Sequence, residues 1–388
     1  MVQGKPESYD HGDEMKKLIK KISPFMVMDI LARARTMKNA IHMEVGEPDL
    51  EPSEKVKEAF KKAIRDNKFH YTPATGLTEL REKIADYYMI KYNVSISPDR
   101  IIVTPGTSGA FMVVFSLLAD RDKKIVLSDP SYPCYKNFAY FLDTEPDFIP
   151  VDRHTNYEIS AETVREMNNI GSLVVSSPSN PVGNLYNDKT IEGLISLADQ
   201  KGFYFISDEI YHGLVYDNNE RTALEFSDRA IVINGFSKYF CMPGFRVGWM
   251  ILPEELVRQA EIIIQNIFIA ANTPAQHAAL AAFDLNHLAY VRNTFRERRD
   301  FLYNELKEIF IIDAAPDGAF YIWADISTYS KDSMEFCRRL LDEKAVAITP
   351  GIDFGSNRTN HYVRLAYTQE IAKLTAGIKR LKEFLAQA

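Results

Sequence analysis

Short apolar runs that alternate with helical segments are the feature of this 388-residue sequence that most restricts its fold. Segments of helical period, such as residues 110–118 and 190–200, lie between several of these runs. Brief, continuously apolar strands that alternate with helices are typical of a mainly parallel sheet covered on both faces. Ligands of such α/β sheets bind beyond the carboxyl ends of the strands, so functional residues are expected directly after each strand. The predicted strands are residues 101–103, 125–127, 173–175, 204–206, 231–233 and 249–252.

The segments on either side of this region follow a different pattern. Before it, the sequence predicts a helix over 25–37, an extended piece over 41–45 and a helix that ends at Arg65 and begins after Ser53, a natural N-cap. Residues 1–17 are polar and are expected to form a solvated arm. After residue 285 the pattern predicts a second, smaller α+β unit, with strands at 319–323 and 363–366 and helices at 288–310, 334–343 and 371–386.

Composition excludes several classes of protein. The 46 Lys and Arg residues are outnumbered by 53 Asp and Glu, and this net charge of −7 disfavours a general nucleic-acid binder. The most apolar stretches, 111–119 and 262–271, are far shorter than the roughly 20 residues that span a bilayer. The amino terminus lacks the apolar core of an export signal. The three cysteines are far apart and the eight histidines form no zinc motif, so we expect a cytoplasmic protein without a disulfide framework or a metal.

Small, rigid or polar residues follow the first three predicted strands. Residues 104–110 are small and lead into a helix, where free N–H groups and the helix dipole can bind a phosphate, although simple capping is also compatible. Tyr132 stands between two prolines as a rigid aromatic plate, or merely as a packed loop residue. Asn180 lies in a turn that two prolines and a glycine constrain, which can aim its amide in one direction.

Ionisable residues follow the next two strands. Asp208 emerges from a buried strand, where an unpaired carboxylate is unfavourable, so it requires a cationic or hydrogen-bonding partner. Tyr211 follows three residues later. Lys238 comes after the fifth strand with Ser237 directly before it, and Arg246 lies a few residues beyond. Lone lysines are usually solvated, but this one closes a run of small and apolar residues.

These groups together suit one ligand, pyridoxal phosphate. Its phosphate requires backbone donors and a cation, and its ring requires an aromatic face and a carboxylate beside the pyridine nitrogen. Its aldehyde requires a lysine that forms a Schiff base. The sequence therefore predicts pyridoxal 5'-phosphate as cofactor.

The same residues belong to longer stretches that resemble the class I and II aminotransferases, fold-type I pyridoxal-phosphate enzymes typified by aspartate aminotransferase. The resemblance extends from about residue 28 to the carboxyl end, and the order and separation of the stretches match the family. It implies an α/β fold: a large cofactor-binding domain (47–285) with a mainly parallel seven-stranded sheet between helices, and a smaller α+β domain (18–46 and 286–388). The stretches are VGEPD (45–49), YTPATGLTELREKIA (71–85), PGTSGA (105–110), SSPSNPVG (176–183), SDEIYHGLVYD (207–217), GFSKYFCMPGFRVGW (235–249) and YVRLAY (362–367).

The resemblance also implies catalytic roles. Lys238 would form the internal aldimine and, once released by substrate, move the proton between the substrate Cα and the cofactor. Asp208 would pair with the pyridinium nitrogen, and Tyr132 would stack on the ring. Asn180 and Tyr211 would hydrogen-bond the ring oxygen.

Further residues would bind the phosphate and the substrate. Arg364 would hold the substrate α-carboxylate in a bidentate fork, for which arginine is better suited than lysine, unless it is a surface salt-bridge residue. The Gly46 backbone would close over the same carboxylate. Tyr71 would reach the phosphate of a neighbouring subunit, so the resemblance implies a homodimer. The phosphate would be held by Thr107, Ser108, Ser237 and Arg246.

The predicted activity is ping-pong transfer of an amino group between an L-amino acid and a 2-oxo acid. A carbon–sulfur β-lyase on the same fold, or a non-catalytic ligand-sensing domain, are the alternatives. The sequence departs from some aspartate-specific relatives because residues 104–110 contain no basic residue for an acidic substrate, although another arginine could serve. Tyr239, Phe240 and Cys241 after the lysine also differ from the small residues that are commoner there.

Overall fold

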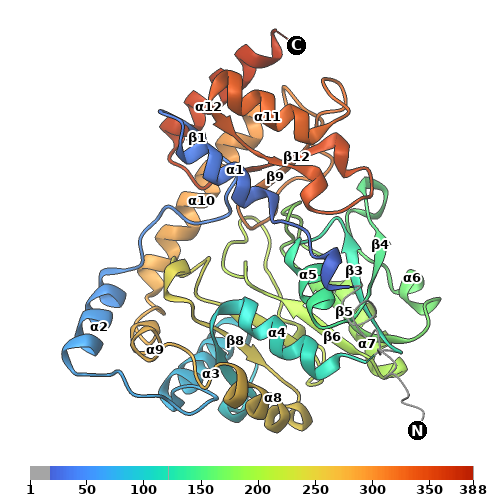
Figure 1. Ribbon diagram of the computed structural model, residues 1–388. Helices are drawn as coiled ribbons and strands as arrows, with labels where there is room; N and C mark the ends of the chain where they lie inside the picture. Colours follow the sequence, from blue (N-terminus) through green and yellow to red (C-terminus); the bar gives the residue numbers. More distant parts are fainter. Residues whose placement is uncertain (1–17, 121, 388) are drawn as a thin grey trace, which may run out of the picture.

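The computed structural model describes residues 18–120 and 122–387 (Figure 1). The predicted N-terminal arm, residues 1–17, lies outside the described residues. Two bodies of secondary structure are stacked in Figure 1, with a large sheet in the lower one and two small sheets in the upper one. No helix among the described residues has the length and apolar character that crossing a membrane requires.

A seven-stranded sheet forms the centre of the larger body. It consists of β2 (Ile101–Thr104), β3 (Lys124–Asp129), β4 (Pro146–Pro150), β5 (Ile170–Ser176), β6 (Tyr204–Asp208), β7 (Ile231–Gly235) and β8 (Gly248–Ile251). Their order across the sheet is β2-β8-β7-β6-β5-β3-β4. Only β8 runs against the others, being antiparallel to both β2 and β7. The predicted mainly parallel α/β sheet is therefore confirmed.

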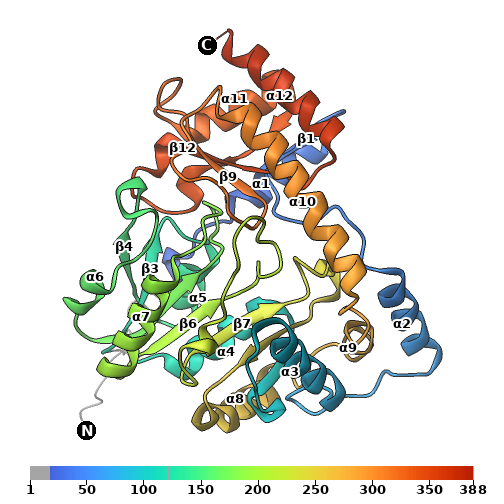
Figure 2. The same cartoon turned by 180° about the vertical axis from the view of Figure 1, so that it is seen from behind.

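Helices cover both faces of this sheet. α4, α5 and α8 lie on one face (Figure 1), whereas α3, α6 and α7 lie on the other (Figure 2). Alternate residues of each strand enter the two cores: Ile102 packs with Phe111 of α4, while Ile101 and Val103 pack with Leu80 of α3. The helices are α3 (Thr78–Tyr92), α4 (Gly106–Leu118), α5 (Cys134–Phe141), α6 (Ala161–Arg165), α7 (Asp188–Lys201), α8 (Glu254–Ile267) and α9 (Thr273–Ala279).

The smaller body combines both ends of the described chain. Its sheets are β11 (Thr349–Pro350), β12 (Tyr362–Ala366) and β9 (Tyr321–Asp325), which are antiparallel, and β1 (Ile41–His42) with β10 (Val346–Ala347), which are parallel. β1 is shorter than the extended piece predicted over 41–45. The α10 helix connects the two bodies (Figure 2). The helices of this body are α1 (Met26–Arg35), α10 (Leu285–Leu306), α11 (Ser333–Lys344) and α12 (Ile371–Leu385).

Local sequence accounts for several element boundaries. Ser53 caps α2 (Glu54–Arg65) as predicted, since its Oγ accepts a hydrogen bond from the backbone N–H of Val56 at 3.3 Å. Such a cap contributes about 1 kcal/mol. β4 was not predicted, because prolines at both of its ends mask its strand character. It lies at the sheet edge, where prolines are tolerated.

The topology brings the functional segments to one edge of the large sheet. β2, β3, β5, β6 and β7 run in the same direction, so their carboxyl ends lie at the same edge. β8 runs in the opposite direction and begins at this edge. Residues 236–247, which connect β7 to β8, therefore lie there as well. The polar residues predicted after separate strands are thereby placed side by side.

Candidate active site

A cavity of about 380 Å³ lies at this edge, lined by residues from both bodies. The larger body contributes the segments that follow its strands. The smaller body contributes the start of α1 and side chains from β9 and β12. The structure brings together in this one cavity the predicted residues Gly46, Thr107, Ser108, Tyr132, Asn180, Asp208, Tyr211, Ser237, Lys238, Arg246 and Arg364.

Tyr71 is the predicted site residue that does not line this cavity. Its side chain is 77% exposed on the surface of the described chain. The predicted contact of Tyr71 with a neighbouring subunit needs an exposed position of this kind.

Asp208 ends β6 and is almost fully buried. Its Oδ2 accepts a hydrogen bond from the Tyr135 hydroxyl, and its Oδ1 accepts one from the backbone N–H of Ile210 at 3.1 Å. Burial raises the pKa of Asp208 to about 6, although these hydrogen bonds and nearby Lys238 favour the charged form. A cation placed beside this carboxylate would remove the electrostatic penalty of its burial.

Lys238 follows β7 and extends into the same cavity. Its Nζ donates a hydrogen bond to the carbonyl oxygen of Gly46 at 2.5 Å. Burial, followed by the positive charge of Arg364, lowers the pKa of Lys238 to about 8. Roughly a tenth of the amine is then neutral at pH 7, far more than for an ordinary lysine with a pKa of about 10.4. Lys238 is therefore suited to act as a nucleophile and as a base.

Arg364, on β12, is only 2% exposed, which excludes the alternative of a surface salt bridge. Its Nη1 donates to Asn180 Oδ1 at 2.8 Å and its Nη2 donates to the carbonyl oxygen of Glu44 at 2.6 Å. Its buried Nε has no hydrogen-bond partner. The carboxylate of Asp353 interacts with this guanidinium through space, but the two groups form no ion-pair contact among the described residues. A buried cation without an acid in direct contact is unfavourable, so the arrangement is suited to binding an anionic ligand.

The start of α4 and Arg246 form a second place for an anion. Gly106 opens α4 directly after β2, and Thr107 and Ser108 follow in its first turn, where backbone N–H groups lack helical partners. Gly106 has a φ of 71°, and a Cβ there would lie 2.7 Å from Nη2 of Arg246. Glycine thus lets the guanidinium lie against the beginning of the helix.

Several residues that line the cavity were not predicted from the sequence. Tyr135 lies one helical turn after Tyr132 and binds Asp208. Tyr321 lies under the Arg364 guanidinium at 4.2 Å, and its hydroxyl is 2.8 Å from that of Tyr211. The spacing of Tyr132 and Tyr135 could have suggested the first. No local signal marks Tyr321, because its neighbours in space are distant in sequence.

Comparison with known proteins identifies the family. The model of the family "Aminotransferase class I and II" matches residues 38–381. The chain is 37% identical to a (5-formylfuran-3-yl)methyl phosphate transaminase of Methanocaldococcus jannaschii, over 96% of this chain and 99% of the relative. It is 34% identical to a valine–pyruvate aminotransferase of Mycobacterium tuberculosis, over 94% and 97% of the two chains. The crystal structure of an aminotransferase from Mycobacterium tuberculosis matches with a TM-score of 0.92 and 33% identity, covering 96% of this chain and 99% of that one.

The chain therefore belongs to the class I and II aminotransferases, a family of pyridoxal-phosphate-dependent enzymes, and it is an aminotransferase. The predicted family, fold and reaction class are confirmed. These comparisons give no support to the alternatives of a β-lyase or a ligand-sensing domain. The named relatives act on different substrates, so their names do not identify the substrate of this chain.

Proposed function

We propose that this aminotransferase binds pyridoxal phosphate in the cavity between its two bodies and moves an amino group between an L-amino acid whose side chain is not acidic and a 2-oxo acid. The observation that carries the proposal is the meeting, in one cavity, of a lysine with a lowered pKa and a buried carboxylate that has no basic partner forming an ion pair with it. Buried Arg364, with an unpartnered Nε, supplies the site for a substrate carboxylate.

The donor set of the cavity fits the cofactor. Its phosphate would be held by the first turn of α4, with Thr107 and Ser108, and by Ser237 and Arg246. Asp208 would pair with the protonated ring nitrogen, which would satisfy the carboxylate that burial now disfavours. The ring would lie against Tyr132, and its oxygen would be within reach of Asn180 and Tyr211. When bound, the cofactor supplies an aldehyde and a ring that accepts electrons.

The protein's own residues would carry out binding and proton transfer. Neutral Lys238 would take the proton from the substrate Cα and, now as the protonated amine, would pass it to the reacting carbon of the cofactor. Its pKa of about 8 makes both steps feasible near neutral pH. Asp208 would keep a proton on the ring nitrogen by its negative charge, held in place by Tyr135 and the N–H of Ile210.

Arg364 would bind the substrate α-carboxylate. Its guanidinium is held by Asn180, by the Glu44 carbonyl and by the ring of Tyr321, so it is oriented before substrate arrives. Pre-orientation reduces the entropy lost on binding. Gly46 lines the same cavity as Arg364. Its carbonyl oxygen now accepts a hydrogen bond from Lys238 and would lose this contact when the lysine reacts.

The cavity wall favours a substrate whose side chain is not acidic. Phe25, Val27 and Met28, at the start of α1, line the cavity together with Phe111 and Ile210. Among the described residues, the basic side chains that line it are Lys238, Arg246 and Arg364. Each of these has a role above, so within the described part of the chain no further cation is available for a second substrate carboxylate.

A panel of half-reactions tests the proposal. Purified protein is loaded with pyridoxal phosphate, and each amino acid is added without an oxo acid while the visible spectrum is followed. We expect loss of the bound cofactor's visible band with one 2-oxo acid formed per site, faster for apolar and aromatic donors than for aspartate or glutamate. A protein that takes up no cofactor, or releases ammonia and pyruvate from cystathionine instead, would refute the proposal.

The same proposal includes a homodimer in the cytoplasm. Tyr71, exposed beside exposed Phe69, would reach the phosphate site of the second subunit. Residues 18–46 and 286–388 would form the small domain and residues 47–285 the large one. Sedimentation measures the assembly directly. Mixing Lys238→Ala subunits with Tyr71→Phe subunits tests whether two subunits share a site, because a gain in activity requires Tyr71 of one subunit to complete the site that holds Lys238 of the other.

A further inference from the structure

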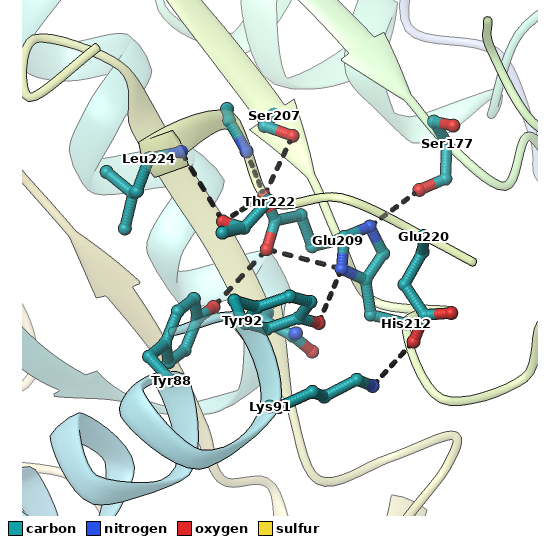
Figure 3. Close-up of polar contacts among 12 residues, drawn as sticks. Tyr88, Lys91, Tyr92, Ser177, Ser207, Glu209, His212, Glu220, Thr222 and Leu224 are labelled. Carbon is teal, nitrogen blue, oxygen red and sulfur yellow. Dashed lines mark hydrogen bonds and ion pairs between the residues drawn. The ribbon is translucent and has the colours of Figure 1, made fainter. Parts of the chain in front are cut away.

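A buried polar cluster lies behind the cavity and has no part in the chemistry above. We call Lys91, Glu209, His212 and Glu220, with the groups that bind them, the Lys91 cluster (Figure 3). None of these four residues lines the cavity. Glu209 and His212 are 0% and 3% exposed, and their segment also carries Asp208 and Tyr211. The chain thus places buried ionisable groups between its catalytic residues in sequence, but outside the site in space.

Lys91 is a cation within a ring of aromatic side chains. It lies near the end of α3, and its Nζ is 2.6 Å from Glu220 Oε1 and 3.1 Å from the Tyr87 hydroxyl. The same Nζ lies over three rings, those of Tyr87 (5.4 Å), Tyr92 (5.2 Å) and Tyr239 (5.4 Å). Burial alone would lower the pKa of Lys91, but Tyr87 and Glu220 outweigh this, so its pKa is raised and it stays charged.

Tyr239 connects this cation to the catalytic lysine. It directly follows Lys238 and belongs to the segment whose large residues depart from the commoner pattern. Its ring lies against Gly213: the φ of Gly213 is 96°, and a Cβ there would come 2.0 Å from the ring. The N–H of Gly213 donates to Glu220 at 2.8 Å. Lys91, Glu220, Gly213 and Tyr239 therefore form one continuous packed unit.

His212 connects the cluster to the loop that carries Asn180. Its Nε2 donates to the carbonyl oxygen of Ser177 at 3.0 Å, three residues before Asn180. Burial lowers the pKa of His212 to about 4, so the ring is neutral and its Nδ1 accepts from the Tyr92 hydroxyl at 2.8 Å. Both ring nitrogens are thus used to hold the loop to α3 (Figure 3).

Glu209 connects the cluster to the segment after β6. Its Oε1 accepts from the Thr222 hydroxyl at 2.8 Å, the Ala223 N–H at 3.0 Å and the Ser207 hydroxyl at 3.2 Å. Its Oε2 lies 3.3 Å from the Tyr88 hydroxyl of α3. Asp208 and Ile210 on either side point into the cavity. A displacement of Glu209 would therefore be passed directly to the carboxylate beside the ring nitrogen.

From these contacts we propose that Lys91 is a positioning residue: with Glu220 and His212 it holds the three segments that carry Lys238, Asp208 and Asn180 in the geometry that catalysis requires. The proposal rests on the proposed function. Each of the three segments joins the cluster at a residue that does not line the cavity. Tyr239 contacts Lys91, Ser177 binds His212, and Glu209 is itself a member of the cluster. Rigid support of this kind matters because small displacements of reacting groups reduce rates strongly.

The experiment compares Lys91 variants of the cofactor-loaded enzyme. Lys91→Met removes the charge, Lys91→Arg keeps it, and Lys91→Met with Glu220→Gln removes both charges so that no buried acid is left unpaired. Lys83→Met, an exposed lysine on the same helix, is the matched control. The measurements are kcat, KM for the best amino donor, the thermal midpoint, and the pH midpoint of the bound cofactor's visible absorbance.

We expect kcat to fall about 10- to 30-fold in Lys91→Met and in the double variant, with KM changed by less than about threefold. The pH midpoint of the absorbance should move in both, and Lys91→Arg should recover most of the loss. Because the double variant changes no net charge, a shift in that variant reports geometry rather than a Coulomb effect. The double variant also keeps the test valid where Lys91→Met does not fold.

A folded double variant with the kcat and pH midpoint of the wild type would overturn this inference. So would a loss that only follows the thermal midpoint, without a change in the absorbance midpoint. Failure of the wild type to bind cofactor or to react with any amino acid would instead refute the proposed function. The two failures are thus distinguished by the wild-type measurement that precedes the comparison.

Discussion

Two largely buried lysines of this chain, Lys238 and Lys91, differ in what surrounds them. Lys238 faces a cavity and the positive charges of Arg364 and Arg246, and its pKa is lowered to about 8. Lys91 faces Glu220 and three tyrosine rings, and its pKa is raised. Burial opposes the charge of both amines, so their partners decide the opposite outcomes. Lys238 can therefore lose its proton and react, whereas Lys91 keeps its proton and stabilises the structure around it.

The acids that accompany these lysines differ in the same way. Asp208 is buried without a cation in hydrogen-bond contact, and its pKa is raised to about 6. Glu220 is also buried, but contact with Lys91 lowers its pKa to about 2. A buried acid without a cationic partner thus marks a place where a ligand is expected, whereas a buried acid in a complete ion pair stabilises the structure. The predictions below test that distinction.

The largest effect is expected for Lys238→Ala. Loss of the nucleophile and base should reduce amino transfer by more than about 10⁴-fold and abolish the visible band of the bound cofactor. The contrast is with Lys91→Met, which should retain the band. Steady-state assays and spectra of both purified variants provide the measurement. An active Lys238→Ala enzyme would remove the functional difference between the two lysines.

Asp208→Asn is expected to reduce kcat by about 10²- to 10³-fold, because a preorganised charge at the ring nitrogen is lost. The cofactor-free variant should nevertheless melt at a higher temperature than wild type at pH 7. The folded-state pKa of Asp208 lies above its unfolded value, so its contribution to stability is present below about pH 4 and is lost as pH rises through about 6. Single-turnover kinetics and thermal melts at pH 4 and 7 test both parts. A loss below tenfold would exclude the proposed role.

Glu220→Gln is expected to reduce the free energy of unfolding by about 3 kcal/mol, since it leaves Lys91 buried without its acid. Glu58→Gln, which breaks an exposed pair with Lys61, should change the stability very little, because solvent screens that pair. The pKa of Glu220 is lowered, so its stabilising effect is present above about pH 4.5 and is lost as pH falls towards 2. Urea titrations between pH 3 and 7 should show this gap closing at low pH. Equal effects of the two variants would contradict the distinction between them.

The smallest perturbation is chemical labelling of the unmodified, cofactor-free protein. Neutral amines react with acetic anhydride, so labelling of Lys238 should rise with pH around a midpoint near 8, well below that of a surface lysine. Lys91 should remain unlabelled throughout the same range, because its proton is retained. Peptide mass spectrometry after competitive labelling measures both residues in one sample. Similar midpoints for the two lysines would show that their surroundings do not differ as described.

The residues that follow strands could be identified from the sequence because parallel strands share an edge. Apolar runs before Asp208 and Lys238 showed that these groups leave the sheet at its carboxyl end. The family stretches then suggested which chemistry they serve. Tyr135 and Tyr321 were missed because their contacts with Asp208 and Tyr211 join distant parts of the chain, which no local pattern encodes.

The amino-acid sequence alone determined the order of the strands along the chain, the types of reactive group that follow them and their likeness to one enzyme family. Only the tertiary structure decided that Arg364 is buried with an unpartnered Nε and that Lys91 is paired with Glu220 among aromatic rings. Sequence defines which groups are present and which strand edge they reach. Their pKa values and roles depend on partners brought close by packing, and Coulomb and desolvation energies depend on those distances.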